Sequence, residues 1–212
     1  MKKILMICLA LSFICLKAYS AQEDGNIQLP APDMKGGRPL MEALKDRKTD
    51  REFSAKPLSP QTLSDLLWAG FGINRPESGL RTAPSTRNCQ EIDIYVAMQS
   101  GLYLYDAKNN ILIKLLGQDI RADTGKQEFV GRAPVDLVFV ADLTKAAQLG
   151  DKTMFYTACD TGFISENVYL FCASEGLATV VRGMFDEQIL AKAMKLTQDQ
   201  KIILTQTVGY RK

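Results

Sequence analysis

The segment from Pro134 to Ala141 constrains the fold more than any other part of the chain. It has the length of a strand and is almost continuously apolar, through Val135, Leu137, Val138, Phe139 and Val140. A run of this length without polar alternation is typical of a strand that is covered on both faces. We therefore expect the central strand of a buried sheet here.

Five further segments have the features of strands. Residues 92–96 alternate in polarity, which is the period of a strand. Residues 102–106 and 111–116 predict a hairpin, because the turn between them contains asparagines, which tolerate the positive φ that such turns require. Two more strands are expected over residues 177–182 and 202–208.

The best-marked helix begins after Ser59, which can cap it. Pro60 suits the first helical position, and Gly70 and Gly72 are expected to end the helix. Shorter helices are predicted over residues 39–47 and after a cap at Asp186.

The longest predicted helix runs from about Lys152 to Glu175 and stops at Gly176. Within it, Ala158 and Gly162 lie one turn apart. Small residues at this spacing let another helix approach closely. The pair therefore suits either a buried core helix or a dimer interface.

The first 20 residues have the pattern of a cleavable signal peptide. Two lysines precede a 13-residue apolar run, Ile4–Leu16, and Ala18 and Ser20 are the small residues that a signal peptidase reads. The run is shorter than the roughly 20 residues that cross a bilayer, which disfavours the alternative of a permanent anchor. We expect export to the periplasm, with no stable membrane anchor after cleavage.

The charge balance argues against nucleic acid as a partner. Of 26 basic residues, Lys2, Lys3 and Lys17 would leave with the signal peptide, so 23 would face 24 acidic residues, a net charge of −1. A nucleic-acid-binding domain would instead have a net basic face. The mature chain is expected to form one domain over residues 39–212, after an extended N-terminal segment over residues 21–38 that is rich in proline and glycine.

The chain contains no histidine. Ser-His-Asp hydrolases, Cys-His proteases, HExxH metalloproteases and His-ligated haem are therefore excluded. Cys159 and Cys172 are thirteen residues apart in one predicted helix, or about 20 Å. That is too far for a disulfide, which tolerates about 7 Å between Cα atoms. We interpret these thiols and Cys89 as small buried hydrophobic groups, and we expect no metal site.

Residues Arg47–Phe53 place three cations and a hydroxyl within five positions. Guanidinium, ammonium and hydroxyl groups are the donors that phosphate oxygens accept. In an extended segment alternate residues point the same way, so Arg47, Thr49 and Arg51 can converge on one ligand. The alternative is a solvated charged loop.

Residues 81–90 form a second polar segment, which by itself is only a loop long enough to bind a ligand. Two common phosphate signatures are absent. Ile120 and Gln127 stand where a Walker loop needs glycine and a hydroxyl residue, and the glycines at 70 and 72 lack the third one of a dinucleotide fingerprint.

Taken together, these segments resemble the FMN-dependent nitroreductase superfamily. Arg47–Phe53 is similar to its Arg-Arg-Ser-x-Arg-x-Phe signature, and Pro84–Gln90 to its Pro-Ser-Ser-x-Asn-x-Gln loop. Val181–Asp186 resembles the segment that closes over the flavin, and Val208–Tyr210 resembles the last core strand. Glu91 stands where many members have proline, and we expect it not to touch the flavin.

A branch of the superfamily is also indicated. Residues 27–32, 81–85 and 102–106 are similar to the branch that includes the thiazole/oxazole-peptide dehydrogenases. We interpret this similarity as kinship and not as an indication of that substrate. The superfamily resemblance implies an α+β nitroreductase fold, with a mainly antiparallel central sheet flanked by helices. It also implies a homodimer that forms through the helix over residues 152–175, with FMN sites at the interface.

The resemblance further implies a role for each matching residue. Arg51 would face the N1–O2 edge of the flavin, where a fixed cation stabilises the negative charge that reduction places there. The backbone amides of Arg182 and Gly183 would reach O4 and N5. The FMN phosphate and ribityl chain would be held by Arg47, Lys48, Thr49 and Arg211.

The remaining predicted contacts concern the flavin ring. The partner subunit would cover the ring with its own copy of the loop over residues 84–88. The side chain of residue 127 would meet the pyrimidine. The residues implied for these contacts are Pro84, Ser85, Thr86 and Asn88 for the cover and Gln127 for the pyrimidine.

The function that follows is an exported FMN-dependent oxidoreductase. It would pass hydride from NAD(P)H through flavin N5 to a nitroaromatic, quinone or similar planar acceptor, without a side chain acting as general acid or base. One alternative is a flavin-binding or scavenging protein without NAD(P)H turnover, because NAD(P)H is scarce outside the cytoplasm. Another is a structural dimer without flavin.

Overall fold

A computed structural model describes residues 25–212 of the protein. The predicted signal peptide, residues 1–20, lies outside this part of the chain. Within residues 25–212, no helix is both long enough and apolar enough to cross a membrane.

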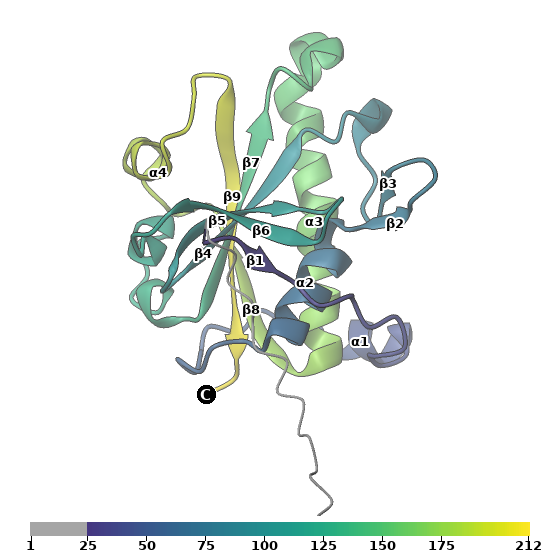
Figure 1. The fold of residues 1–212 in the computed structure, drawn as a ribbon, viewed down its shortest axis with the longest axis vertical. Helices are drawn as coiled ribbons and strands as arrows, with labels where there is room; N and C mark the ends of the chain where they lie inside the picture. The colour runs from purple at the N-terminus through teal and green to yellow at the C-terminus, as the bar shows by residue number, and fades with distance from the viewer. Residues whose placement is uncertain (1–24) are drawn as a thin grey trace, which may run out of the picture.

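A seven-stranded sheet forms the centre of the fold (Figure 1), and every neighbouring pair of strands in it is antiparallel. The order along the sheet is β1-β6-β5-β4-β7-β9-β8. The mainly antiparallel sheet expected from the sequence is confirmed. The strands are β1 (Ile27–Gln28), β4 (Ile92–Met98), β5 (Gly101–Asp106), β6 (Ile111–Leu116), β7 (Val135–Asp142), β8 (Leu177–Arg182) and β9 (Gln200–Tyr210).

The central position of the apolar run is confirmed, because β7 pairs with β4 on one side and β9 on the other. Its residues alternate between two hydrophobic clusters. Leu137 and Phe139 belong to the cluster with α2 (Pro60–Phe71) and α3 (Thr153–Glu175), whereas Val138 and Val140 belong to the cluster with α4 (Glu187–Met194). Figure 1 shows α2 and α3 on one side of the sheet and α4 on the other.

The helix ends follow the signals in the sequence. Ser59 Oγ accepts a hydrogen bond from Thr62 N at 3.0 Å, and Asp186 Oδ1 accepts one from Ile189 N at 3.0 Å. Gly176 has a φ of 70° and ends α3. The first helix, α1 (Leu40–Asp46), lies within the predicted range.

The sequence predicted that Gly70 would help to end α2, and this prediction is wrong. Gly70 lies inside the helix. A Cβ at this position would come within 3.2 Å of Val168 Cγ2 on α3. The glycine therefore permits the close approach of the two helices, and Gly72 alone is the cap.

Several short elements have no counterpart in the sequence prediction. A separate two-stranded sheet pairs β2 (Ile73–Arg75) with β3 (Leu80–Arg81). The 3₁₀ turns are η1 (Thr86–Asn88), η2 (Arg121–Thr124), η3 (Val130–Arg132) and η4 (Ala147–Lys152).

The three cysteines in the described part of the chain are free, which for Cys159 and Cys172 agrees with their spacing along one helix. Cys172 is buried, but Cys89 and Cys159 are partly exposed, which corrects the expectation that all three thiols are buried.

Candidate functional site

The cationic segment Arg47–Phe53 lies across the ends of β8 and β9. Asp50 N donates to Thr179 O at 2.9 Å, Ser54 N donates to Tyr210 O at 2.8 Å, and Phe53 forms a bridge with Arg211. These backbone contacts hold the segment beside the sheet, so it is not merely a solvated loop.

Tyr169 of α3 ties this segment to β8. Its hydroxyl lies 3.0 Å from Thr49 Oγ1 and accepts a hydrogen bond from Val181 N at 3.0 Å. The Arg47 guanidinium lies over the Tyr169 ring, 5.3 Å from its centroid. Tyr169 was not predicted from the sequence, because a tyrosine on a helix carries no signal of such a contact.

A cavity of about 710 Å³ lies at this end of the molecule. Three of the predicted phosphate ligands, Arg47, Lys48 and Arg211, line it together. Thr49 and Arg51 do not line it. The other charged lining residues are Arg38, Lys45, Asp46 and Glu175.

The lining contains five cations and two carboxylates, which makes the cavity suited to an anion. Arg38 and Lys45 were missed by the sequence analysis, and neither belongs to a recognisable motif. Part of the charge is neutralised locally, because Arg38 pairs with Asp46 at 2.7 Å. The carboxylate of Asp50 also lies between Lys48, at 3.8 Å, and Arg211, at 3.7 Å.

The free edge of β8 presents a row of backbone groups beside the cationic segment. Thr179 O accepts from Asp50 N and Val181 N donates to Tyr169 OH, so the odd-numbered residues of β8 direct these groups away from β9. Because this direction alternates along a strand, the N–H of Gly183 continues the row. It has no hydrogen-bond partner within residues 25–212, and Gly183 is exposed.

The neighbouring Arg182 has a different environment. It lies opposite Thr205 in the ladder, so its N–H points toward β9 by the same alternation. Its side chain is buried and donates to Asp136 Oδ1 at 2.8 Å, Thr207 Oγ1 at 2.8 Å and Thr124 O at 2.7 Å. These bonds anchor the strand end that leads into Gly183.

Burial dominates the electrostatics of this anchor. Burial raises the pKa of Asp136 to about 7, while the Arg182 guanidinium and the Thr207 hydroxyl oppose that shift. Burial also lowers the pKa of Arg182. A Cβ at Gly125 would collide with Arg182 Nη1, so a glycine is required beside the guanidinium.

Two further predicted cofactor residues have groups without a protein partner. Gln127 is half-buried, and its Oε1 atom accepts no hydrogen bond within the described chain. Arg51 is exposed and makes no hydrogen bond or ion pair to residues 25–212. Both side chains are thus available to a ligand.

The loop Pro84–Asn88 lies elsewhere on the protomer. Thr86 N donates to Asp160 Oδ2 at 2.7 Å, whereas the cationic segment contacts Tyr169, nine residues further along α3. Nine residues of helix span about 14 Å. The structure therefore does not bring this loop together with Arg47, Lys48 and Arg211 in one chain.

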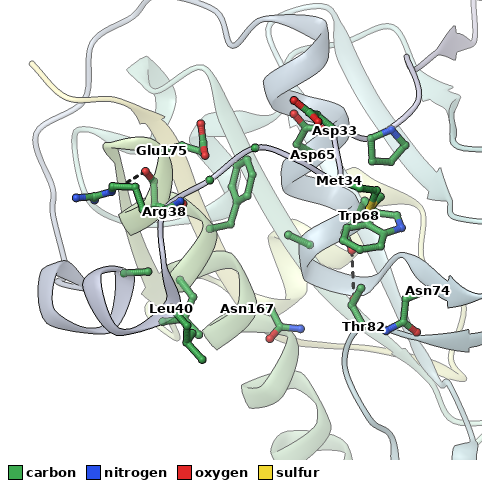
Figure 2. Close-up of a pocket in the computed structure, with 18 residues that line it drawn as sticks. Asp33, Met34, Arg38, Leu40, Asp65, Trp68, Asn74, Thr82, Asn167 and Glu175 are labelled. Atoms are coloured by element: carbon green, nitrogen blue, oxygen red, sulfur yellow. Dashed lines mark hydrogen bonds between the residues drawn. The ribbon is translucent and has the colours of Figure 1, made fainter.

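A second cavity, of about 620 Å³, adjoins the first at Arg38, Ser174 and Glu175. Figure 2 shows Trp68 and Met34 on one side of it and Leu40 on another, with Asp33 and Asp65 at its rim. None of the predicted cofactor residues lines this cavity. Within residues 25–212, no cluster of three or more Cys, Asp or Glu residues could hold a metal ion.

The antiparallel sheet between helix layers, with a cationic cavity and an unpaired amide at the edge of β8, agrees with the nitroreductase type of fold that the sequence motifs indicated. The chain belongs to the nitroreductase family: the family model matches residues 44–210. This confirms the superfamily and the fold expected from the sequence motifs.

Individual relatives agree with this assignment. The chain is 45% identical to a proposed nitroreductase of Ralstonia eutropha JMP134 of known structure, with a TM-score of 0.84 over 88% of this chain and 90% of that one. It is 27% identical, over 81% of this chain and 91% of the other, to the proposed nitroreductase MJ1384 of Methanocaldococcus jannaschii.

A further solved structure shares the fold. The microcin synthetase McbBCD complex of E. coli, with truncated pro-MccB17 bound, contains a chain of similar fold. The TM-score is 0.69 at 20% identity, over 98% of this chain and 85% of that one. At this identity the likeness concerns the fold.

Proposed function

We propose that the protein is an exported FMN-dependent oxidoreductase that passes hydride from NAD(P)H to a nitroaromatic, quinone or similar planar acceptor. The observation that carries this proposal is the unpaired N–H of Gly183, which continues the row of edge groups on β8 beside the cationic cavity. A phosphate site and a fixed donor for a ring atom are the two features that an FMN site requires.

The donors and acceptors of this chain fit FMN. Arg47, Lys48 and Arg211 would hold the phosphate, because they line one cavity that is rich in cations. The N–H of Gly183 would donate to the N5–O4 edge of the ring. When bound, FMN would supply two-electron hydride chemistry.

Two more side chains fit the pyrimidine end of the ring. Arg51 has no protein partner in the described chain and would place its positive charge near N1 and O2. Gln127 Oε1 would accept the ring N–H after a rotation of its amide, since the atom is buried and unpaired. The buried Arg182 side chain would act only as the anchor of the strand that carries Gly183.

We further propose a homodimer that forms through α3. The solvent-facing side of this helix exposes Phe155, at 65%, and Phe163, at 49%, beside the small residues Ala158 and Gly162. Contiguous exposed apolar patches mark interaction surfaces, and we infer that these side chains along one helix form such a patch. The partner's loop 84–88 would then cover the flavin, since in one chain this loop lies apart from the cationic cavity.

Anaerobic titration of the purified mature protein with NADH and with NADPH tests this function. The proposal predicts a flavin absorption spectrum that bleaches within one turnover and recovers when a quinone or nitroaromatic is added. Bound flavin that neither nicotinamide reduces would favour the flavin-scavenging alternative. A colourless protein that cannot be reconstituted with FMN would contradict both. Export is tested separately, by locating the protein in the periplasmic fraction of cells that express the full chain.

A further inference from the structure

The side chain of Glu91 is fully buried at the start of β4, directly after the loop that carries Thr86. Its exposed fraction is 0%, and neither carboxylate oxygen has a hydrogen-bond partner within residues 25–212. An ionised carboxylate in such a place is costly, because it has lost its hydration without gaining a partner. The group therefore needs either a proton or a function that compensates for its burial.

Two residues of α3 face Glu91. Thr157 and Asp160 are one helical turn apart, so they share a face of the helix. The Asp160 carboxyl acts on the Glu91 carboxyl both by its charge and as a hydrogen-bonding neighbour, and the Thr157 hydroxyl lies nearby without a hydrogen-bond partner in the described chain. Asp160 is itself 1% exposed, so the two carboxyl groups share one buried site.

Asp160 holds the loop. Its Oδ2 accepts from Thr86 N at 2.7 Å, and its Oδ1 accepts from Thr86 Oγ1 at 3.2 Å. Arg87, Asn88 and Gln90 have φ angles of 53°, 54° and 48°. Non-glycine residues rarely adopt this conformation, and it persists only where surrounding contacts enforce it. The Asp160–Thr86 pair is such a contact.

No cation of the described chain neutralises the two carboxyl groups. The charged group that faces Glu91 from α3 is Asp160. At the end of β7, Asp142 donates its N–H to Glu91 O, but its carboxylate accepts from Thr144. Arg87, in the loop, donates instead to Gln148 O on η4. Ionising Glu91 beside the Asp160 carboxylate is therefore costly, because burial and the neighbouring charge both favour the protonated form of Glu91.

We propose that Glu91 is a positioning residue, whose protonated carboxyl donates to Asp160 and thereby keeps Asp160 in place as the acceptor that holds Thr86. The loop 84–88 is then locked in the shape that covers the flavin, an inference that rests on the proposed function. Loss of the proton places two negative charges side by side, which drives Asp160 away and releases the loop.

The direction of the pH effect follows from the surroundings of Glu91. Burial and the neighbouring Asp160 carboxylate raise the pKa of Glu91 above its ordinary value. A raised pKa in the folded protein means that the locked loop is fully favoured at low pH. Its stability is lost as the pH rises through the raised pKa.

Hydrogen exchange of the Thr86 amide in flavin-free protein tests the proposal without requiring cofactor. Wild type is compared with Glu91→Gln, an isostere that donates at every pH, and with Glu77→Gln, an exposed control. We expect the protection of Thr86 in wild type, relative to Glu91→Gln at the same pH, to fall about tenfold for each pH unit above the pKa. Glu77→Gln should match wild type. Equal protection in wild type and Glu91→Gln from pH 5 to pH 9 would overturn the proposal.

A second variant tests whether donation, and not mere volume, is what matters. Glu91→Leu fills the same space without a donor, so Thr86 should be less protected in it than in Glu91→Gln at every pH. Equal protection in these two variants would show that Glu91 only fills space, which would overturn the positioning role.

Flavin affinity gives an independent readout in the full-length protein. The FMN dissociation constant of wild type should rise with pH in parallel with the loss of Thr86 protection, and that of Glu91→Gln should stay constant over the same range. The same dependence of the FMN dissociation constant on pH in wild type and Glu91→Gln would overturn the link to the flavin site. If no FMN binds at all, the proposed function fails, and the exchange experiment still decides the role of Glu91.

Discussion

Asp136 and Arg182 form an ion pair at 2.8 Å in which neither side chain is more than 2% exposed. Asp136 comes from the central strand β7 and Arg182 from the last position of the edge strand β8. The pair spans β9, since β9 lies between these two strands. It therefore fixes the point at which the chain leaves the sheet and presents the N–H of Gly183.

Replacement of Asp136 by alanine should destabilise the protein by about 3–5 kcal/mol, because it leaves the Arg182 guanidinium buried without a counter-charge. The free energy of unfolding is to be measured by urea denaturation at pH 8, above the pKa of about 7. The double variant Asp136→Leu with Arg182→Met should recover most of the loss, since apolar pairs replace buried ion pairs at little cost. A loss below about 1 kcal/mol for Asp136→Ala would contradict this assignment.

Removal of the Gly183 N–H should weaken FMN binding. Gly183→Pro deletes the donor, and a hydrogen bond between neutral groups is worth about 0.5–1.5 kcal/mol, so affinity should fall roughly two- to tenfold. Gly183→Ala is the matched control: it keeps the N–H, and its Cβ would meet only Leu204 Cδ2, at 3.9 Å. Fluorescence titration with FMN compares the two variants. Equal affinities for both would remove Gly183 from the site.

Arg51→Ala should leave the protein folded but weaken FMN roughly ten- to a hundredfold and lower the reduction potential of the bound flavin. The fold is spared because Arg51 makes no hydrogen bond or ion pair with the described chain. Arg47→Ala should weaken FMN with little change in potential, because the phosphate lies far from the ring. Spectroelectrochemistry separates the two variants. A loss of affinity without any shift in potential in Arg51→Ala would make Arg51 only another phosphate ligand.

A charge on the exposed face of α3 should disrupt the proposed dimer. Phe155→Glu places a carboxylate in the proposed interface and should yield monomers with much weaker FMN binding, because the partner's loop is then lost. Ile189→Glu on α4 is the control, since Ile189 is similarly exposed on the opposite side of the sheet. Light scattering after size exclusion gives the mass of each variant. A dimeric Phe155→Glu protein with normal FMN affinity would place the interface elsewhere.

The sequence predicted those elements whose signals are local. The cap at Ser59, the cap at Asp186 and the stop at Gly176 depend on neighbouring residues, and each is confirmed. The central strand was predicted because an unbroken apolar run requires cover on both faces. The role of Gly70 was not, since an internal glycine and a terminal one look alike until the packing of Val168 against it is known.

The candidate site could be predicted from the sequence only in part. Arg47 was recognised from a motif and Arg211 from its place after the last strand of the resembled family, and the structure brings them into one cavity although they are far apart in the chain. Tyr169 and Asp160 carry no motif, and their roles depend on which strand or loop packs against each turn of α3. The burial of Glu91 is likewise a property of the fold, because nothing in a lone glutamate before a strand indicates that α3 covers it.

The most direct test of the FMN site is a titration of the flavin-free protein with FMN and with riboflavin, followed by flavin fluorescence. Riboflavin has the same ring but no phosphate, so it cannot use the cations that line the cavity of Arg47, Lys48 and Arg211. We predict one FMN bound per chain, with riboflavin at least about a hundredfold weaker, since two charge-assisted bonds are lost. Equal affinity for the two flavins, or no binding of either, would contradict the FMN site described for this protein.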